Sequence, residues 1–160
     1  MSIKSKKAFT MIELVFVIVV LGILASVAIP KFAATRSDAH IAKGRSDVSS
    51  IRSAIISERQ SRLFRGNPVF IATLDDGGNA LFGGLPALNP PQILLQYPIA
   101  AGVGNGKWQT DGDGLGYTFT ILGAANTFTY CPDIASACGT PGTFDCVDDA
   151  TAPSCGLLTD

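Results

Sequence analysis

The chain has 160 residues and a formal net charge of −1. This length predicts one domain with an appendage. The charge argues against a nucleic-acid partner, because proteins that bind phosphate backbones normally contain a net basic domain.

The net charge conceals an uneven distribution along the sequence. Residues 1–30 carry three lysines and one glutamate, residues 31–65 carry eight basic and three acidic residues, and residues 66–160 carry Lys107 and nine aspartates. The three parts therefore have charges of +2, +5 and −8. A basic segment joined to an acidic one predicts that copies of the chain attract one another.

An apolar run follows a short basic leader. Residues 1–8 are polar and contain Lys4, Lys6 and Lys7, and the run covers the 21 residues 9–29. As a helix this run would be about 31 Å long, which matches the hydrocarbon core of a bilayer. Because the lysines precede the span, the positive-inside rule predicts a cytoplasmic N-terminus and places everything after residue 30 outside the inner membrane.

Glu13 is the only charged residue in the apolar run. A charge at membrane depth costs about 2.5–3.5 kcal/mol even on lenient insertion scales, so this carboxylate requires a partner. Two simpler interpretations remain open. Glu13 could reach the headgroups at the end of a plain membrane anchor. The N-terminus could also be a secretory signal, with an apolar core at residues 14–24 and a cleavage site at residues 26–28.

Two residues weaken the helix near the end of the apolar run. Pro30 lacks a backbone N–H and leaves the carbonyl of Ser26 without its usual donor, which favours a kink. The Ser26 hydroxyl is a local polar group that could help to satisfy the freed backbone. Gly22 costs about 1 kcal/mol of helix propensity relative to alanine. The helix is therefore expected to bend or loosen between these two positions.

Beyond Pro30 the sequence has the period of an amphipathic helix. The apolar stripe consists of Phe32, Val48, Ile51, Ile55 and Leu63, with Ala33, Ala39 and Ala54 between them. Arginines lie largely off this stripe, at Arg45, Arg52, Arg59 and Arg62. His40 is expected on the basic, solvent-facing surface. Residues 66–68 (Gly-Asn-Pro) end the pattern, so one near-continuous helix is predicted over residues 9–64.

Residues 67–160 have the composition of a small β-rich head. The sequence predicts an edge strand at 68–74, a loop at 75–91 and a short apolar run at 93–97. Alternating residues at 116–122 and 127–131 predict a β-hairpin with a four-residue loop at 123–126. Trp108 is expected to be half-buried in a strand, and the last 25 residues are expected to be loop. The predicted class is α+β.

The four cysteines lie in the last thirty residues, at Cys131, Cys138, Cys146 and Cys155. Behind a membrane-targeting segment they predict two disulfides in an oxidising compartment. Three pairings are possible, and the shortest loops favour Cys131–Cys138 and Cys146–Cys155. Zinc is the alternative, but the spacings lack the close C-x₂₋₄-C pair that zinc sites usually contain.

Two groups of aspartates are candidates for calcium. Asp111 and Asp113 resemble the start of a calcium loop, but Leu115 and Leu122 occupy positions that need oxygen ligands, so a Gly/Asp turn is the favoured interpretation. Asp145, Asp148 and Asp149 form the second group, for which a solvated loop is favoured. No cofactor is predicted. With one histidine and no G-x-S-x-G motif, the chain is not expected to be an enzyme.

The segment KKAFTMIELVFVIVVLGILASVAIPKF resembles the N-terminus of type IV pilins and of type II secretion pseudopilins. The shared elements are the basic leader, Phe9, Thr10, Glu13, Leu14, the apolar run with Gly22, and Pro30. The resemblance implies that a prepilin peptidase cuts between Ala8 and Phe9 and methylates the new amine of Phe9. The family usually has glycine where this chain has Ala8.

The resemblance also supplies a partner for Glu13. Cleavage would create an amine at Phe9, and residues four apart share a face of a helix. Opposite charges in a low dielectric attract strongly. In the family this glutamate is thought to neutralise the amine of a neighbouring subunit during assembly, although a pair within one chain remains open.

The resemblance implies a structural subunit of a helical filament in which the apolar halves of the helices pack together. The expected parts are a leader at 1–8, a transmembrane half-helix at 9–29, an amphipathic half-helix at 30–66 and a head at 67–160. The expected partners are other pilin-like subunits, a prepilin peptidase and an inner-membrane assembly platform. A type II secretion pseudopilin is favoured over a surface type IV pilin. An anchored periplasmic binding domain that does not polymerise is the third hypothesis.

Overall fold

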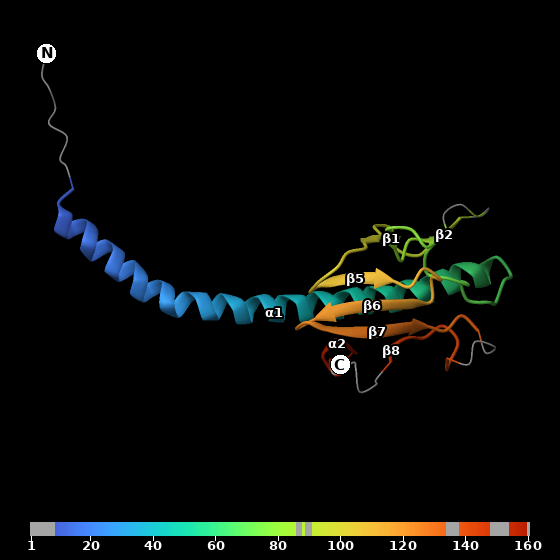
Figure 1. Cartoon of the computed structure of the whole chain (residues 1–160). Helices are drawn as coiled ribbons and strands as arrows, with labels where there is room; N and C mark the ends of the chain where they lie inside the picture. The colour runs from blue at the N-terminus through green and yellow to red at the C-terminus, as the bar shows by residue number, and fades with distance from the viewer. Residues whose placement is uncertain (1–8, 86–87, 89–90, 134–137, 148–153, 160) are drawn as a thin grey trace, which may run out of the picture. The chain divides into compact units, whose positions relative to one another are not determined.

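The structure is a computed structural model, and it describes residues 9–85, 88, 91–133, 138–147 and 154–159. The chain forms two compact units, Met1–Arg36 and Ser37–Asp160. Helix α1 (Met11–Phe64) contributes to both units, and the strands and the short helix α2 (Gly156–Thr159) belong to the second (Figure 1). The predicted α+β class with a long N-terminal helix is confirmed.

The first unit consists of the apolar part of α1. Its large side chains are exposed, and by length and composition α1 contains a stretch that could cross a membrane. The helix continues through Pro30. The Ser26 hydroxyl donates to the carbonyl of Ile23 at 2.7 Å, which lies in the turn before Ser26. A serine side chain on a helix reaches the carbonyls of the preceding turn more readily than its own.

In the second unit α1 buries one face against the sheet. Val48, Ile51 and Ile55 are at most 2% exposed, as the apolar stripe predicts. Two members of that stripe lie outside the core, because Phe32 belongs to the first unit and Leu63 is 48% exposed. The three buried residues define the face of α1 that contacts the sheet. The next positions on that face, at the same helical spacing, are occupied by charged residues and not by Leu63.

Those positions hold a buried ion pair, Glu58 and Arg62. Their side chains are 7% and 10% exposed, and Arg62 Nε lies 3.6 Å from a carboxylate oxygen of Glu58. Arg62 also donates to the carbonyls of Val69 (3.0 Å) and Phe70 (2.6 Å). Arg62 is therefore not on the solvent face, and the segment predicted as an edge strand at 68–74 is instead a non-strand segment bonded to this arginine.

A four-stranded antiparallel sheet packs on this part of α1 (Figure 1). Its order is β5 (Lys107–Thr110), β6 (Gly116–Ile121), β7 (Ala124–Tyr130) and β8 (Phe144–Cys146). Every second residue of β6 is buried, which confirms the alternation seen in the sequence. β8 lies in the region expected to be loop, and so does the helix α2.

Two small ribbons lie in and just after the region predicted as loop and short apolar run. β1 (Ala80–Leu81) pairs with β4 (Ile99–Ala100), and β2 (Gly84–Leu85) pairs with β3 (Gln92–Ile93). Two-residue strands are too short for alternation to be recognised in the sequence. These ribbons contribute Leu81 and the neighbouring Phe82 to the core.

The β6–β7 hairpin has a two-residue turn, Leu122 and Gly123, so the predicted four-residue loop is wrong. Ile121 pairs directly with Ala124, and the two turn residues have φ of 53° and 79°. Positive φ at both positions is the pattern of the type I′ turn, whose twist matches that of the strands. Gly123 accepts this conformation at no cost, whereas Leu122 is strained.

Replacing Leu122 with Asn should therefore stabilise the head by about 0.5–1 kcal/mol, because Asn tolerates positive φ and Asn-Gly is a preferred I′ sequence. The Leu122 side chain is 57% exposed, so little packing is lost. The measurement is the urea midpoint of the full chain in detergent, with Leu122→Ala as the control that keeps the strain. An unchanged or lower midpoint for the Asn variant would contradict this account of the turn.

Trp108 lies at the centre of the core and not half-buried as predicted. Its side chain is 0% exposed, and its ring contacts the rings of Phe82, Phe119 and Phe128 at centroid distances of 5.4, 4.8 and 5.2 Å. The indole N–H donates to the carboxylate of Asp47 on α1 at 2.9 Å. Trp108 therefore joins the sheet to the helix through both apolar packing and a hydrogen bond.

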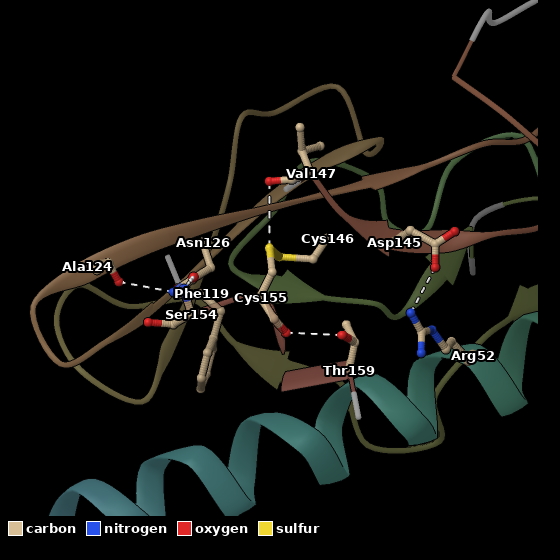
Figure 2. The surroundings of a disulfide bond; sticks show 10 residues. All are labelled: Arg52, Phe119, Ala124, Asn126, Asp145, Cys146, Val147, Ser154, Cys155 and Thr159. Carbon is tan, nitrogen blue, oxygen red and sulfur yellow. Dashed lines mark hydrogen bonds and ion pairs between the residues drawn. A yellow bond between two sulfur atoms is a disulfide. The ribbon is translucent and has the colours of Figure 1, made fainter. Parts of the chain in front are cut away.

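The C-terminal segment is fastened to the sheet by covalent and polar contacts (Figure 2). The structure has the short-loop disulfides, Cys131–Cys138 and Cys146–Cys155. Buried Asn126 accepts the Ser154 N–H at 3.2 Å. Leu158 of α2 is 1% exposed and lies against Gly44, where a Cβ would clash with it. The four sulfur atoms are thus in disulfides and are not available as zinc thiolates.

Candidate processing and assembly site

α1 begins at Met11 because Thr10 caps it. The Glu13 N–H lies 3.3 Å from the Thr10 hydroxyl and 3.1 Å from the Thr10 carbonyl, which also accepts from Leu14 at 3.2 Å. Thr10 and Glu13 have the spacing of a capping box. The sequence-based predictions missed this role of Thr10, although T-x-x-E ahead of an apolar run is its signal.

Phe9 lies before the helix, so the prediction that Phe9 and Glu13 share a helix face is wrong. The cap at Thr10 is the physical reason, because the helix begins only after the capping residue and Phe9 precedes it. An amine on Phe9 would lie near the positive end of the helix dipole. The dipole would disfavour the positive charge of that amine, whereas it favours the negative charge of Glu13 in the first turn. The amine would therefore depend more strongly on a nearby carboxylate.

Glu13 has no ion-pair partner within the part of the chain that the structure describes. The ion pairs there are Lys43–Asp47, Arg52–Asp145 and Glu58–Arg62. The nearest residues in the sequence, Met11, Ile12 and Leu14, are apolar and 57–83% exposed. A carboxylate among exposed apolar side chains costs free energy in an apolar environment, and a cation from outside the chain would offset that cost.

The other residues singled out for processing and packing are distributed along the same segment. Ala8 lies outside the described residues, so cleavage between Ala8 and Phe9 stays a prediction. At Gly22 a Cβ would meet nothing within 4 Å. The glycine therefore relieves no clash within this chain, and its absent side chain leaves room on the helix surface.

Asp111 and Asp113 hold the turn between β5 and β6. Asp113 accepts the N–H groups of Leu115 (2.7 Å) and Gly116 (3.0 Å), and Asp111 accepts that of Asp113 (3.3 Å). Burial and the hydrogen bond with Asp113 raise the pKa of Asp111, and the same hydrogen bond lowers the pKa of Asp113. The favoured Gly/Asp turn is thus present.

Calcium binding at this turn stays the less favoured alternative. Within the described ranges, no group of three or more His, Cys, Asp or Glu residues is placed to hold a metal ion. In the second group of candidates, Asp145 forms an ion pair with Arg52 at 2.8 Å (Figure 2). Asp148 and Asp149 lie outside the described residues.

His40 is half-buried, and its predicted place on the solvent-facing surface is wrong. The imidazole lies against Gly106, where a Cβ would clash with the ring. Gly106 also has φ of 74°, so both the backbone conformation and the contact with His40 favour glycine at this position. The contact comes from a loop about 65 residues away in the sequence, which helix periodicity alone does not reveal.

Residues 3–29 match the family described as the prokaryotic N-terminal methylation motif. No curated protein matches the chain. No solved structure matches it either. The match covers Phe9, Glu13 and Gly22 and confirms the resemblance drawn from the same segment. Together with the exposed apolar helix and its single carboxylate, it shows that this chain carries at residues 3–29 the prepilin-type signal of type IV pilins and pseudopilins.

Proposed function

We propose that this protein is a structural subunit of a type IV pilus-like filament. The leader of residues 1–8 is removed by a prepilin peptidase, Phe9 is methylated, and the apolar parts of α1 from many copies pack together. The head of each copy lies outside the inner membrane. The chain is a single-pass membrane protein until it enters the filament, which an inner-membrane platform assembles.

One observation carries this proposal: Glu13 is a carboxylate in an exposed apolar helix without an ion-pair partner among the described residues of its own chain. In a plain membrane anchor this carboxylate would only cost free energy in lipid. In a filament subunit it has a role, because it pairs with the amine that processing creates on Phe9 of a neighbouring copy. Exposed residues such as Gly22 permit close approach between helices.

We favour a type II secretion pseudopilin, which forms a short periplasmic filament that helps to export folded proteins. The modest size and the single small head of the chain support this choice. A surface type IV pilin for adhesion, motility or DNA uptake is the second candidate. Gene neighbours distinguish the two: a secretin with other pseudopilins supports the first, and a retraction ATPase supports the second.

A binding domain that is anchored in the membrane and does not polymerise is the alternative of a different class. It would need the apolar part of α1 only as an anchor, so the charge on Glu13 would be dispensable. Neutralising Glu13 while measuring leader removal and assembly separately therefore tests the proposed function.

A further inference from the structure

We propose that a groove on α1, bordered by Arg45 and Arg52, binds the acidic turn of residues 111–114 of a second copy of this chain. This inference rests on the proposed function and adds to it the surfaces through which neighbouring heads meet. Both surfaces belong to the second unit, Ser37–Asp160.

The groove lies beside α1, where α2 packs on it, and has a volume of about 400 Å³. Its lining consists of Arg45, Val48, Ser49, Arg52, Ser53, Ile56, Leu158 and Thr159. Among these described lining residues, the polar side chains are two guanidinium groups and three hydroxyls, and none is a carboxylate. Arginine binds carboxylates in a fixed, two-pronged geometry, so this lining suits an acidic segment.

The two arginines keep donors for a ligand. Arg45 is exposed, uses Nε to donate to the Leu157 carbonyl at 2.7 Å, and belongs to none of the ion pairs between described residues. Arg52 donates to the Phe144 carbonyl at 2.9 Å and to Asp145 at 2.8 Å (Figure 2). These contacts hold both side chains at the groove, and no ion pair between described residues compensates the charge of Arg45.

The complementary surface is the acidic turn between β5 and β6. Asp111 and Asp113 are exposed, and no ion pair of the described residues includes either of them. The loop carrying Asp75 and Asp76 lies against the turn, because the Leu74 N–H donates to the Gly114 carbonyl at 3.0 Å. Asp76 is exposed, whereas Asp75 is buried, so three exposed carboxylates lie in two adjoining segments. The head that carries them has Lys107 as its only basic residue after Arg65.

The aspartates of these two segments also affect the buried side chain of Tyr117. Its hydroxyl donates to Asp75 at 2.6 Å. Burial raises its pKa, and Asp75, Asp111 and Asp113 raise it further. The exposed carboxylates of Asp76, Asp111 and Asp113 place negative charge at the surface, for which a basic groove on another copy is the matching partner.

The two surfaces lie toward opposite edges of the sheet. The turn begins at the edge strand β5, whereas Arg52 contacts Phe144 and Asp145 of the other edge strand, β8 (Figure 1). One chain therefore cannot satisfy its own groove with its own turn while it stays folded. Two different surfaces that bind head to tail produce an open, extending assembly, which is the symmetry of a filament.

The test places a photo-cross-linking residue in the groove of the full chain, as Ser53→p-benzoylphenylalanine. Ser53 is exposed and lines the groove. The matched control is Ser50→p-benzoylphenylalanine, on the same helix, exposed, but outside the groove. Isolated filaments are irradiated and the adducts are mapped by mass spectrometry. We expect Ser53 to cross-link to residues 108–116 of another chain at least about tenfold more than Ser50 does.

Charge reversal provides the second measurement. Arg45→Glu alone and Asp111→Lys alone should each reduce the assembled fraction about tenfold, and the two together should restore most of it, because the contact is then attractive again with its signs exchanged. Near-ultraviolet circular dichroism establishes that each variant keeps a folded head. Loss of assembly in the double variant with folded heads would overturn the pairing.

The outcomes distinguish this inference from the function on which it rests. Filaments that form but give no adduct at 108–116 of another chain, or adducts only within the same chain, overturn the inference and leave the filament intact. If the unmodified chain loses its leader yet never forms filaments, the proposed function and the inference fail together.

Discussion

Replacing Glu13 with Gln is expected to leave removal of the leader unchanged and to abolish filament assembly. Gln has the same shape as Glu but no charge, so the processed amine of a neighbouring Phe9 would be enclosed among apolar helices without a counter-ion. Removing one partner of a buried ion pair costs about 3–5 kcal/mol. At each subunit contact that is a weakening of association by roughly 10²–10⁴-fold.

Cleavage and assembly are measured separately in the same cells. Gel mobility or intact mass reports leader removal, and electron microscopy of sheared or sedimented material reports filaments. Glu13→Asp is the control, because it keeps the charge on a shorter side chain and should assemble in part. Filaments of normal abundance from the Gln variant would show that the charge pair is not what drives assembly.

Replacing Trp108 with Ala is expected to bring the head close to unfolding. The substitution empties the centre of the aromatic cluster, and such changes cost about 3–5 kcal/mol. It also leaves the buried side of Asp47 without the indole donor that lies 2.9 Å away, which adds about 1 kcal/mol or more. Small domains have only about 5–15 kcal/mol in total.

The measurement is a urea titration of the full chain in detergent, followed by near-ultraviolet circular dichroism. Trp108→Phe is the matched control: it keeps a ring in the cluster and removes the N–H, so its loss should be clearly smaller. If Trp108→Ala unfolds at the same urea concentration as the unchanged chain, the core is not organised around this residue.

The long helix and the central hairpin could be predicted because their signals are local. Val48, Ile51 and Ile55 repeat with the helical period, and Tyr117, Phe119 and Ile121 repeat with the period of a strand. Both patterns depend only on neighbours in the sequence. The structure buries all six residues.

The features that could not be predicted depend on contacts between distant segments. Glu58 and Arg62 are charged and look solvent-exposed, yet carbonyls of the segment after the helix complete the coordination of Arg62 and allow burial. His40 is half-buried because Gly106 provides space for its ring. Trp108 is central because aromatic rings from four separate segments, those of Phe82, Phe119, Phe128 and Phe144, surround it.

The N-terminal site could be found from the sequence because a single carboxylate in an apolar run contradicts the composition around it. That contradiction identified Glu13 without any structure. The place of Phe9 relative to the helix could not be found in the same way, since it depends on the cap formed by Thr10. The cap separates Phe9 from the first helical turn and strengthens the case for a partner on another chain.

The central claim is that the partner of Glu13 does not exist until the chain is cut before Phe9. Intact-mass measurement of the subunit isolated from filaments tests this claim most directly. The account predicts a mass that lacks residues 1–8, carries one added methyl group and is four hydrogens lighter because of two disulfides. A filament subunit that retains its leader, so that Phe9 has no free amine, would contradict it.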